Sequence, residues 1–378
     1  MNKKKLQRLA ITCGGTGGHF YPGLSTARHF HHDGGQVVLL LSGINIDRQS
    51  AEAERHGIET VKLQRMPSPR GISGTIRFLR GFSSGFLQSR RELKKAKVQA
   101  LLGMGSFASF PAALAALSLR IPLFLHDGNA RVGKANRILS RWAKHLGTAF
   151  PAVNPASVKC PLECTGMPLR PELTEPALIG KTSAINEINR LYSSELKSDL
   201  TTILIFGGSQ GAEIFNKIFP AAFMNYRKPF FQVLHLTGQG KYDEVKKAYN
   251  GAKFPTLLLP SSDIMQLLYQ ASDTVICRSG GSTVAELALF AKYAFLIPYP
   301  YAAEKHQDDN ANFYQSTGAA EVINNADCTP EKATEIIGRL KTELEQLNSC
   351  ATAAQAGRPS AATDTISAIK QIFETQAK

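Results

Sequence analysis

The sequence lacks a long hydrophobic run. Its most apolar stretch, residues 107–125, contains Pro111, Arg120 and Pro122, whereas a membrane-spanning helix needs about 20 predominantly apolar residues. The basic residues 1–8 lead directly into a strand pattern without a small-residue cleavage site. We therefore expect neither a membrane span nor a signal peptide.

Cysteine is also scarce. Of the six cysteines, only Cys160 and Cys164 lie close together, four positions apart. Neither a second pair nor a nearby histidine completes a set of zinc ligands. We expect reduced thiols, and we predict neither a metal site nor a cofactor.

Negative charge is sparse in the first half of the chain. The 378 residues include 44 Lys and Arg against 30 Asp and Glu, a net charge of +14. Residues 1–170 hold 25 of these cations and only 8 of the anions, so that their charge is +17, whereas the remaining residues sum to −3. The length predicts two domains, and the balance of apolar and charged residues is that of an ordinary globular protein.

The positive charge is concentrated in residues 65–97, where nine cations accompany a single anion, Glu92. Apolar residues recur among them at helical spacing. This pattern suits a surface for anionic lipid headgroups or phosphates; a solvated helix face and a nucleic-acid surface are the alternatives. We favour a membrane surface, whose contacts would be Ile76, Arg77, Leu79, Arg80, Phe82 and Phe86.

A strand, a glycine-rich turn and a helix occur in this order twice. Residues 8–13 and 202–206 are the strands, and residues 14–18 and 207–211 are the turns. The order is typical of a doubly wound α/β domain, and its recurrence predicts two such domains. The glycine spacing matches neither the dinucleotide fingerprint nor the phosphate-binding loop. The turns are either cradles for two phosphorylated substrates or simple tight turns.

Further buried strands are expected in both halves. The Gly and Pro residues at 166–171 indicate a boundary between two domains. We predict an N-terminal domain at 1–168, a C-terminal domain at 169–350 and closing helices at 351–378. The expected strands are 36–41, 100–102, 123–126, 231–236, 274–277 and 294–297.

Polar residues follow several of these strands. His19 closes the first turn, and its imidazole suits general-base chemistry or a helix cap. Asn129 can bind a sugar hydroxyl or cap the next helix. Glu286 lies one turn into a helix, where it can bind a ribose diol or simply complement the helix dipole. Gln307 belongs to a polar cluster too hydrophilic for a core.

The order of these motifs over some 300 residues resembles the MurG family of bacterial peptidoglycan glycosyltransferases. The resemblance implies a GT-B fold of the α/β class, two Rossmann-like domains facing across a cleft. It implies transfer of N-acetylglucosamine from UDP-N-acetylglucosamine to lipid I, which gives lipid II. It also implies that the reaction needs no obligatory metal. The protein would be peripheral, at the cytoplasmic face of the membrane. The matching segments are 14–19, 103–105, 126–129, 166–170, 207–212, 277–286 and 306–311.

The resemblance also implies residue roles. Catalytic residues would be His19, Asn129 and Glu286, with Glu286 at the ribose and Gln307 at the sugar hydroxyls. The implied binding residues for UDP-N-acetylglucosamine are Thr16, Gly17, Gly18, Asn129, Arg170, Ser209, Gly281, Ser282, Thr283, Val284, Ala285, Glu286 and Gln307.

This sequence departs from the family pattern at a few positions. Gly105-Ser106-Phe107 stands where the family usually has Gly-Gly-Tyr, Asp127-Gly128 where it has Glu-Gln, and Ser261-Ser262 where an apolar pair covers the uracil. Competing functions are a UDP-sugar epimerase, a transferase with another lipid acceptor and a basic nucleic-acid-binding protein. The nucleotide-site motifs disfavour the last of these, so we predict no nucleic-acid partner. A dehydrogenase is disfavoured by the glycine spacing.

Overall fold

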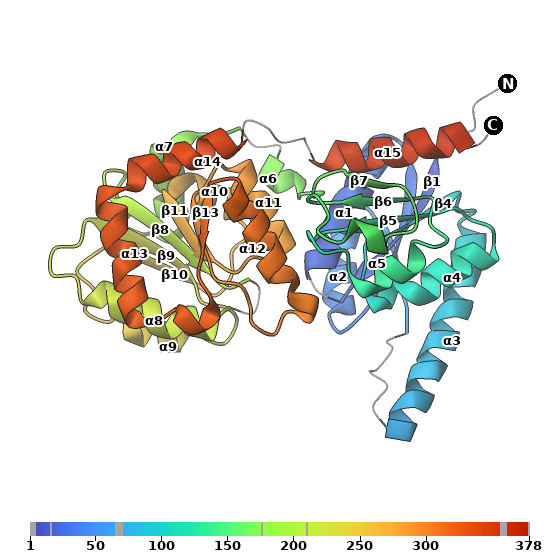
Figure 1. Cartoon of the computed structure of the whole chain (residues 1–378), viewed down its shortest axis with the longest axis horizontal. Helices are drawn as coiled ribbons and strands as arrows, with labels where there is room; N and C mark the ends of the chain where they lie inside the picture. Colours follow the sequence, from blue (N-terminus) through green and yellow to red (C-terminus); the bar gives the residue numbers. More distant parts are fainter. Residues whose placement is uncertain are drawn as a thin grey trace. The chain divides into compact units, whose positions relative to one another are not determined.

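The chain folds into two compact units, Met1–Arg170 with Pro359–Lys378 and Pro171–Arg358, here called unit 1 and unit 2. The computed structural model describes residues 5–15, 17–64, 71–174, 177–208, 211–355 and 361–376. The predicted closing segment, 351–378, is divided: α14 (Leu344–Gln355) belongs to unit 2 and α15 (Ala361–Gln376) to unit 1 (Figure 1).

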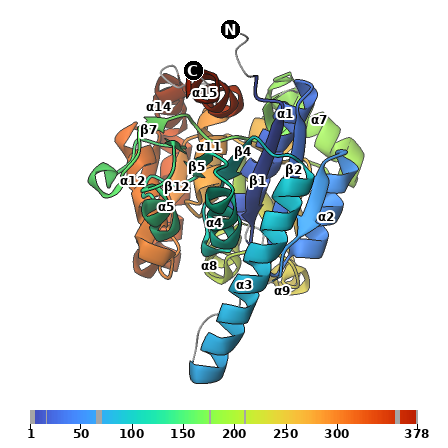
Figure 2. The ribbon, with the colours of Figure 1, turned by 90° about the vertical axis from the view of Figure 1, so that its right-hand side faces the viewer.

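Unit 1 is built on a seven-stranded parallel sheet with the order β3-β2-β1-β4-β5-β6-β7 (Figure 2). Its strands are β1 (Arg8–Gly14), β2 (Gln36–Ser42), β3 (Glu59–Lys62), β4 (Ala100–Gly103), β5 (Leu123–Asp127), β6 (His145–Thr148) and β7 (Leu162–Cys164). Its other helices are α1 (Gly17–His32), α2 (Ile46–Arg55), α3 (Gly71–Lys95), α4 (Phe110–Ser118) and α5 (Lys134–Leu139).

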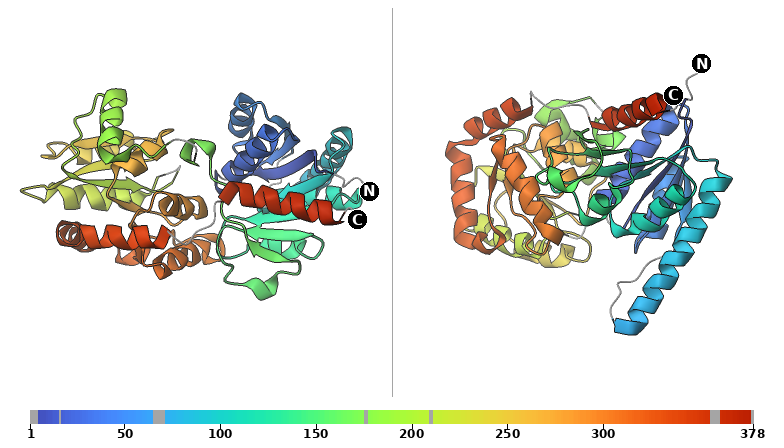
Figure 3. Two further views of the ribbon diagram at one scale, coloured as in Figure 1. Left: turned by 90° about the horizontal axis from the view of Figure 1, so that it is seen from above. Right: turned by 45° about the vertical axis from the view of Figure 1, so that its right-hand side comes forward.

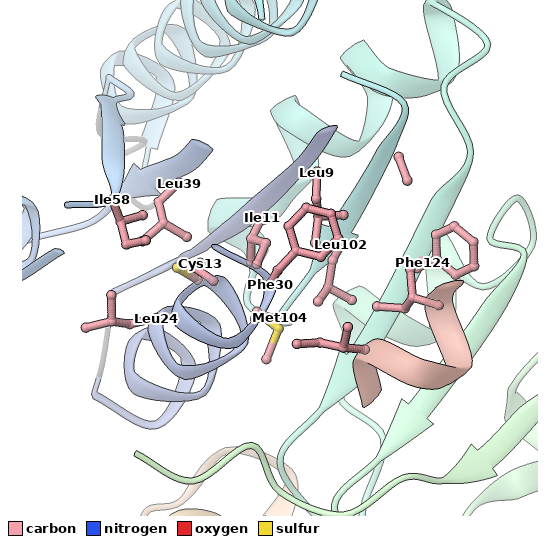
Figure 4. Packing of buried hydrophobic residues seen from close by; sticks show 14 of the residues in the cluster. Leu9, Ile11, Cys13, Leu24, Phe30, Leu39, Ile58, Leu102, Met104 and Phe124 are labelled. Atoms are coloured by element: carbon pink, nitrogen blue, oxygen red, sulfur yellow. The ribbon is translucent and has the colours of Figure 1, made fainter. Parts of the chain in front are cut away.

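Both faces of this sheet are buried, as the continuous apolar strands require. Leu9 and Ile11 point into a core shared with α1, α2 and α15, whereas Ala10 between them faces a core shared with α3, α4 and α5. This alternation is the two-residue period of a strand. Figure 4 shows the first core, and Figure 3 shows α15 lying along unit 1.

Unit 2 repeats the design with six parallel strands in the order β10-β9-β8-β11-β12-β13. The strands are β8 (Thr201–Phe206), β9 (Phe231–Leu236), β10 (Thr256–Leu259), β11 (Thr274–Cys277), β12 (Ala294–Leu296) and β13 (Ala320–Val322). The helices are α6 (Pro171–Thr174), α7 (Gly180–Tyr192), α8 (Glu213–Met224), α9 (Tyr242–Ala248), α10 (Met265–Ala271), α11 (Gly281–Leu289), α12 (His306–Ser316), α13 (Pro330–Thr342) and α14.

The expected strands are all present, and the doubly wound α/β architecture is confirmed in both units. Five strands were not predicted: β3, β6, β7, β10 and β13. All five are only three or four residues long, so they lack the longer continuous apolar run that marks a central strand. Within the described ranges, no helix combines the length and the apolarity needed to cross a membrane.

A buried histidine connects three elements of unit 2. Nε2 of His235, on β9, lies 3.0 Å from Oδ1 of Asn216, and its Nδ1 lies 3.1 Å from the hydroxyl of Tyr249. Because an amide oxygen can only accept, Nε2 carries the proton, and the tyrosine hydroxyl donates to Nδ1. The ring is therefore neutral, and burial lowers the pKa of His235 to about 3.

This histidine predicts sensitivity to acid. As the pH falls below about 6.5 the unfolded chain takes up a proton at His235, whereas the folded chain does not until about pH 3. Above the ordinary histidine pKa, His235 therefore does not change the free energy of unfolding with pH. Below that pKa, the free energy of unfolding should fall by more than about 1 kcal/mol per pH unit. Denaturant unfolding followed by circular dichroism between pH 7 and 5 measures this slope. A His235→Gln variant with an equally steep slope would contradict the assignment.

Candidate functional site

The first glycine turn, residues 14–18, joins β1 to α1 in unit 1. Gly14 has a φ of +127°, and a Cβ there would lie 2.5 Å from the carbonyl oxygen of Ser42 on β2. Only glycine allows the chain to pass so close to the end of the neighbouring strand. The predicted binding residues Gly17 and Gly18 open α1, whereas Thr16 lies outside the described residues.

His19 is held in one orientation by the neighbouring strand end. Its Nδ1 lies 2.9 Å from the carbonyl oxygen of Met104, directly after β4. A carbonyl oxygen only accepts, so Nδ1 carries the proton of the neutral ring and the lone pair resides on Nε2. Gly105 packs against the imidazole, since a Cβ there would lie 3.3 Å from Cε1 of His19. The half-buried ring is thus oriented as a general base requires.

Asp127 organises the loop that carries Asn129. Its Oδ1 accepts from the backbone N–H of Asn129 at 3.2 Å and from Nδ2 of the same residue at 3.3 Å. Its Oδ2 accepts from the backbone N–H of Gly133 at 2.8 Å and from Nδ2 of Asn136 at 3.0 Å. The carboxylate, which the sequence analysis noted only as a departure, fixes the loop through charge-assisted bonds.

His19 and the Asn129 loop lie at the same edge of the sheet. A Cβ on Gly105 would be 3.3 Å from His19 and 3.4 Å from Nδ2 of Asn136, the residue that binds Asp127. A Cβ on Gly128 would lie 3.8 Å from the carbonyl oxygen of Gly18. The first glycine turn, the general-base candidate and Asn129 are therefore neighbours. Asn136 was missed, because its role depends on two residues nine and ten positions earlier.

The segment that leaves unit 1 is fixed on α1. The hydroxyl of Ser25 donates to the carbonyl oxygen of Leu169, and the Arg170 guanidinium lies 4.9 Å from the ring centroid of Tyr21. Nε2 of His126 donates to the carbonyl oxygen of Gly166 at 2.9 Å, and burial lowers the pKa of this histidine. Arg170 is thereby placed by contacts within unit 1.

The second glycine turn, residues 207–211, follows β8 in unit 2 and leads into α8. Gly211 has a φ of +72°, and a Cβ there would lie 2.2 Å from the carbonyl oxygen of Thr237. The turn is therefore packed tightly against the end of β9. The predicted diphosphate residue Ser209 lies outside the described residues, so that its role stays a prediction.

The end of β11 is tied to the neighbouring loops. The hydroxyl of Ser279 donates to the carbonyl oxygen of Gln307 at 2.7 Å, and Nδ2 of Asn310 donates to the carbonyl oxygen of Ser279 at 3.0 Å. Oε1 of Gln307 accepts from the backbone N–H of Tyr299 at 2.9 Å. These bonds bring Gln307 to the same strand end as the start of α11.

The predicted nucleotide-binding run forms the start of α11. Its members differ in accessibility: the side chain of Val284 is fully buried, so that only its backbone can line a ligand. Glu286 is half-buried, and its Oε2 accepts from the hydroxyl of Tyr269 at 2.8 Å. The remaining members, at intermediate exposure, are Gly281, Ser282, Thr283 and Ala285.

Arg278 is a further residue that the sequence analysis did not assign. Its Nη1 donates to the carbonyl oxygens of Ile297 and Pro298, each at 2.9 Å, and to Oδ1 of Asn325 at 2.8 Å. The guanidinium also lies 5.0 Å from the ring centroid of Phe215, in the first turn of α8. Arg278 thus joins the first turn of α8 to the segment after β12. Its place directly after the buried strand β11 was the signal available.

Two family models match the chain over most of its length. The glycosyltransferase family 28 N-terminal domain matches residues 9–148, and the C-terminal domain of the same family matches residues 202–366. The chain belongs to glycosyltransferase family 28.

Two curated relatives of this chain carry the same name. The UDP-N-acetylglucosamine–N-acetylmuramyl-(pentapeptide) pyrophosphoryl-undecaprenol N-acetylglucosamine transferase of Halothermothrix orenii is 31% identical over 380 residues, which cover 96% of this chain and 98% of that protein. The transferase of the same name from Burkholderia pseudomallei is 34% identical, with 85% of each chain covered. The MurG family and the glycosyltransferase class predicted from the motifs are confirmed.

Solved structures agree with the GT-B fold class. The crystal structure of Acinetobacter baumannii MurG has a TM-score of 0.76 and 27% identity, covering 97% of this chain and 99% of that one. The UDP-GlcNAc 2-epimerase of Neisseria meningitidis has a TM-score of 0.66 at 13% identity. The second likeness shows the fold alone.

Ser106 departs from the family 28 glycine pattern at a strained position. It has a φ of 68° and a ψ of 148°, a backbone region that is essentially restricted to glycine and costs about 1–3 kcal/mol for other residues. Its Oγ accepts from the backbone N–H of Ala108 at 3.3 Å, which offsets part of that cost.

Replacing Ser106 by glycine should stabilise the protein. Relief of the strain outweighs the larger conformational entropy of glycine in the unfolded chain, so we expect the free energy of unfolding to rise by about 1 kcal/mol. Chemical denaturation measures it. Ser118→Gly, at the end of α4 with ordinary helical backbone, is the matched control and should be destabilising. Equal losses in both variants would refute strain at Ser106.

Proposed function

We propose that this chain is an inverting glycosyltransferase that moves N-acetylglucosamine from UDP-N-acetylglucosamine to the muramoyl 4-hydroxyl of lipid I, forming lipid II. The observation that carries the proposal is the near full-length similarity to curated transferases of this one name, at 31–34% identity. Family 28 membership by itself supports a glycosyltransferase.

Unit 2 would bind the donor. The second glycine turn offers backbone N–H groups near the start of α8, which suit a diphosphate because the helix N-terminus favours negative charge. Glu286 would accept from the ribose hydroxyls and Gln307 would bind the sugar hydroxyls. Arg170 and Ser209 remain proposed contacts of the diphosphate, whose departing charge is stabilised by such preorganised donors.

Unit 1 would activate the acceptor. The 4-hydroxyl oxygen forms a bond to the anomeric carbon while the bond from that carbon to the UDP diphosphate breaks, which inverts the configuration. The hydroxyl proton moves to Nε2 of His19, whose Nδ1–H is held by Met104. Asn129, fixed by Asp127, is the proposed contact of the reacting sugar.

Transfer of labelled sugar to a short-chain lipid I analogue tests this function. The expected product is the disaccharide lipid, and it should form only with both substrates present. The same enzyme incubated with UDP-N-acetylglucosamine alone should return unchanged donor. Formation of an epimer without acceptor would instead support the epimerase, and an unchanged donor in both reactions would refute the transferase.

The exposed part of α3 is the proposed membrane surface. Ile76 and Leu79 are 47% and 56% exposed, and the neighbouring Arg77 and Arg80 are exposed too. Phe82 is half-buried, and Phe86 packs against the core of unit 1. The helix extends beyond the sheet of its unit (Figures 1 and 2). A groove along it is lined by Leu79, Arg80, Ser83, Ser84, Leu87, Gln88 and Arg91.

Neutralising four cations of α3 should weaken membrane binding. A cation near an anionic bilayer contributes about 1 kcal/mol, so replacing Arg77, Arg80, Arg90 and Arg91 by glutamine should lower the partition coefficient on anionic vesicles by roughly 100-fold or more. UDP binding should not change. The control carries the same charge change in unit 2, at Lys228, Lys246, Lys247 and Lys253. If both quadruple variants bind vesicles equally, α3 is not the docking surface.

A further inference from the structure

A buried tyrosine in unit 2 contacts Glu286 and the residue that directly precedes the second glycine turn. Tyr269, on α10, has no solvent-exposed surface. Its hydroxyl donates to Oε2 of Glu286, on α11, at 2.8 Å. A buried phenol requires a hydrogen-bond acceptor, and a carboxylate is a strong one. The bond therefore joins the interior of the unit to the carboxylate proposed to bind ribose.

The ring of Tyr269 is fixed by two aromatic neighbours. Phe290, which follows α11, stacks on it with centroids 5.0 Å apart and an interplanar angle of 12°. Phe206, the last residue of β8, meets it edge-on with centroids 6.1 Å apart and an angle of 86°. Because Phe206 directly precedes the second glycine turn, one side chain contacts the residue before that turn as well as Glu286.

We propose that Tyr269 is a positioning residue for the donor nucleotide, and this inference rests on the proposed function, in which Glu286 binds the ribose. The bond to Oε2 holds the Glu286 side chain in one rotamer, so that the carboxylate is oriented before the ribose arrives. A free glutamate side chain would lose rotamer entropy on binding, and this loss lowers affinity. The tyrosine thus contributes to nucleotide affinity without touching the nucleotide.

The Tyr269→Phe variant of the full chain tests the inference. The substitution keeps the volume and both ring contacts and removes only the hydroxyl. We expect the affinity for UDP to fall about tenfold and KM for UDP-N-acetylglucosamine to rise equally, with kcat within about threefold of the parent. The preference for UDP over 2′-deoxy-UDP should fall as well, because the affected contact is to the ribose diol. A loss of fold alone would not change that preference.

Tyr314→Phe is the matched control. Tyr314 is also buried, with 1% of its surface exposed, and its hydroxyl also donates at 2.8 Å, but to the carbonyl oxygen of Lys292. The two variants lose the same group and a bond of the same length. If Tyr314→Phe weakens UDP binding as much as Tyr269→Phe does, the inference is overturned.

Glu286→Ala separates this inference from the proposed function. If Glu286→Ala lowers UDP affinity and Tyr269→Phe has no further effect in that background, the tyrosine acts through the glutamate. If Glu286→Ala weakens binding but Tyr269→Phe does not, the positioning role is wrong and the ribose contact stands. If Glu286→Ala changes neither UDP affinity nor the preference over 2′-deoxy-UDP, the ribose role of Glu286 in the proposed function is wrong.

Discussion

Replacement of His19 by alanine is expected to lower the turnover of a lipid I analogue by about 10²–10⁴, the usual contribution of a positioned general base. The reason is geometric. Nδ1 is held by the carbonyl oxygen of Met104 at 2.9 Å, so that the neutral ring carries its lone pair on Nε2, where it can accept the proton of an attacking hydroxyl. Steady-state transfer of labelled sugar at saturating donor measures the effect.

UDP affinity and a second histidine variant provide the controls for His19→Ala. His19 belongs to unit 1, whereas the proposed donor residues Glu286 and Gln307 belong to unit 2, so UDP affinity should be unchanged. His31→Ala removes an exposed histidine at the other end of the same helix and should leave turnover unchanged. Turnover of the His19→Ala variant near that of the parent would show that another group takes the proton.

Gly211→Ala should disrupt donor binding. A Cβ at this position would lie 2.2 Å from the backbone oxygen of Thr237, and φ is +72°. Neither Gly211 nor the end of β9 can accommodate the methyl group without moving. In the proposed function, the displaced turn would no longer present its N–H groups to the diphosphate. We expect a loss of about 10²–10³ in turnover, as when one such donor is removed elsewhere, with UDP affinity reduced in parallel. Calorimetric titration with UDP measures the binding.

A second glycine isolates the steric effect from backbone strain. Gly251, after α9, has a φ of +78° and no atom within 4 Å of the Cβ position. Gly251→Ala should therefore cost about 1 kcal/mol of stability and leave UDP binding intact. If Gly211→Ala binds UDP as well as Gly251→Ala does, the second glycine turn is not the diphosphate cradle.

The sequence predicted those parts of the candidate site that lie at the ends of buried strands. His19, Asn129 and Glu286 each follow a strand that reads as buried, and in a parallel sheet the carboxyl ends of the strands share one edge. The side chains that hold them were not predictable in the same way. Tyr269 lies 17 residues before Glu286, and Met104 lies 85 residues after His19. No local pattern records such pairings, since they form only when separate elements pack together.

Ser106 and Asp127 show how departures from a family pattern acquire meaning in the structure. In the sequence, both are simply residues that differ from the family pattern. In the structure, Asp127 accepts four hydrogen bonds and fixes the Asn129 loop, whereas Ser106 occupies a backbone conformation suited to glycine. One departure is therefore accommodated by four hydrogen bonds to the new side chain, and the other retains strain.

The sequence by itself determined two doubly wound α/β domains, the turns that open them and the uneven charge, because each depends on local periodicity or on composition. Only the tertiary structure decided where the last helix belongs. Ile366 and Ile369 of α15 enter the core of unit 1, and Nζ of Lys370 lies 2.7 Å from Oδ2 of Asp33. An amphipathic helix shows in its sequence that one face must be buried, but not which surface will cover it. That choice depends on residues more than 300 positions away, which meet the helix only in the folded chain.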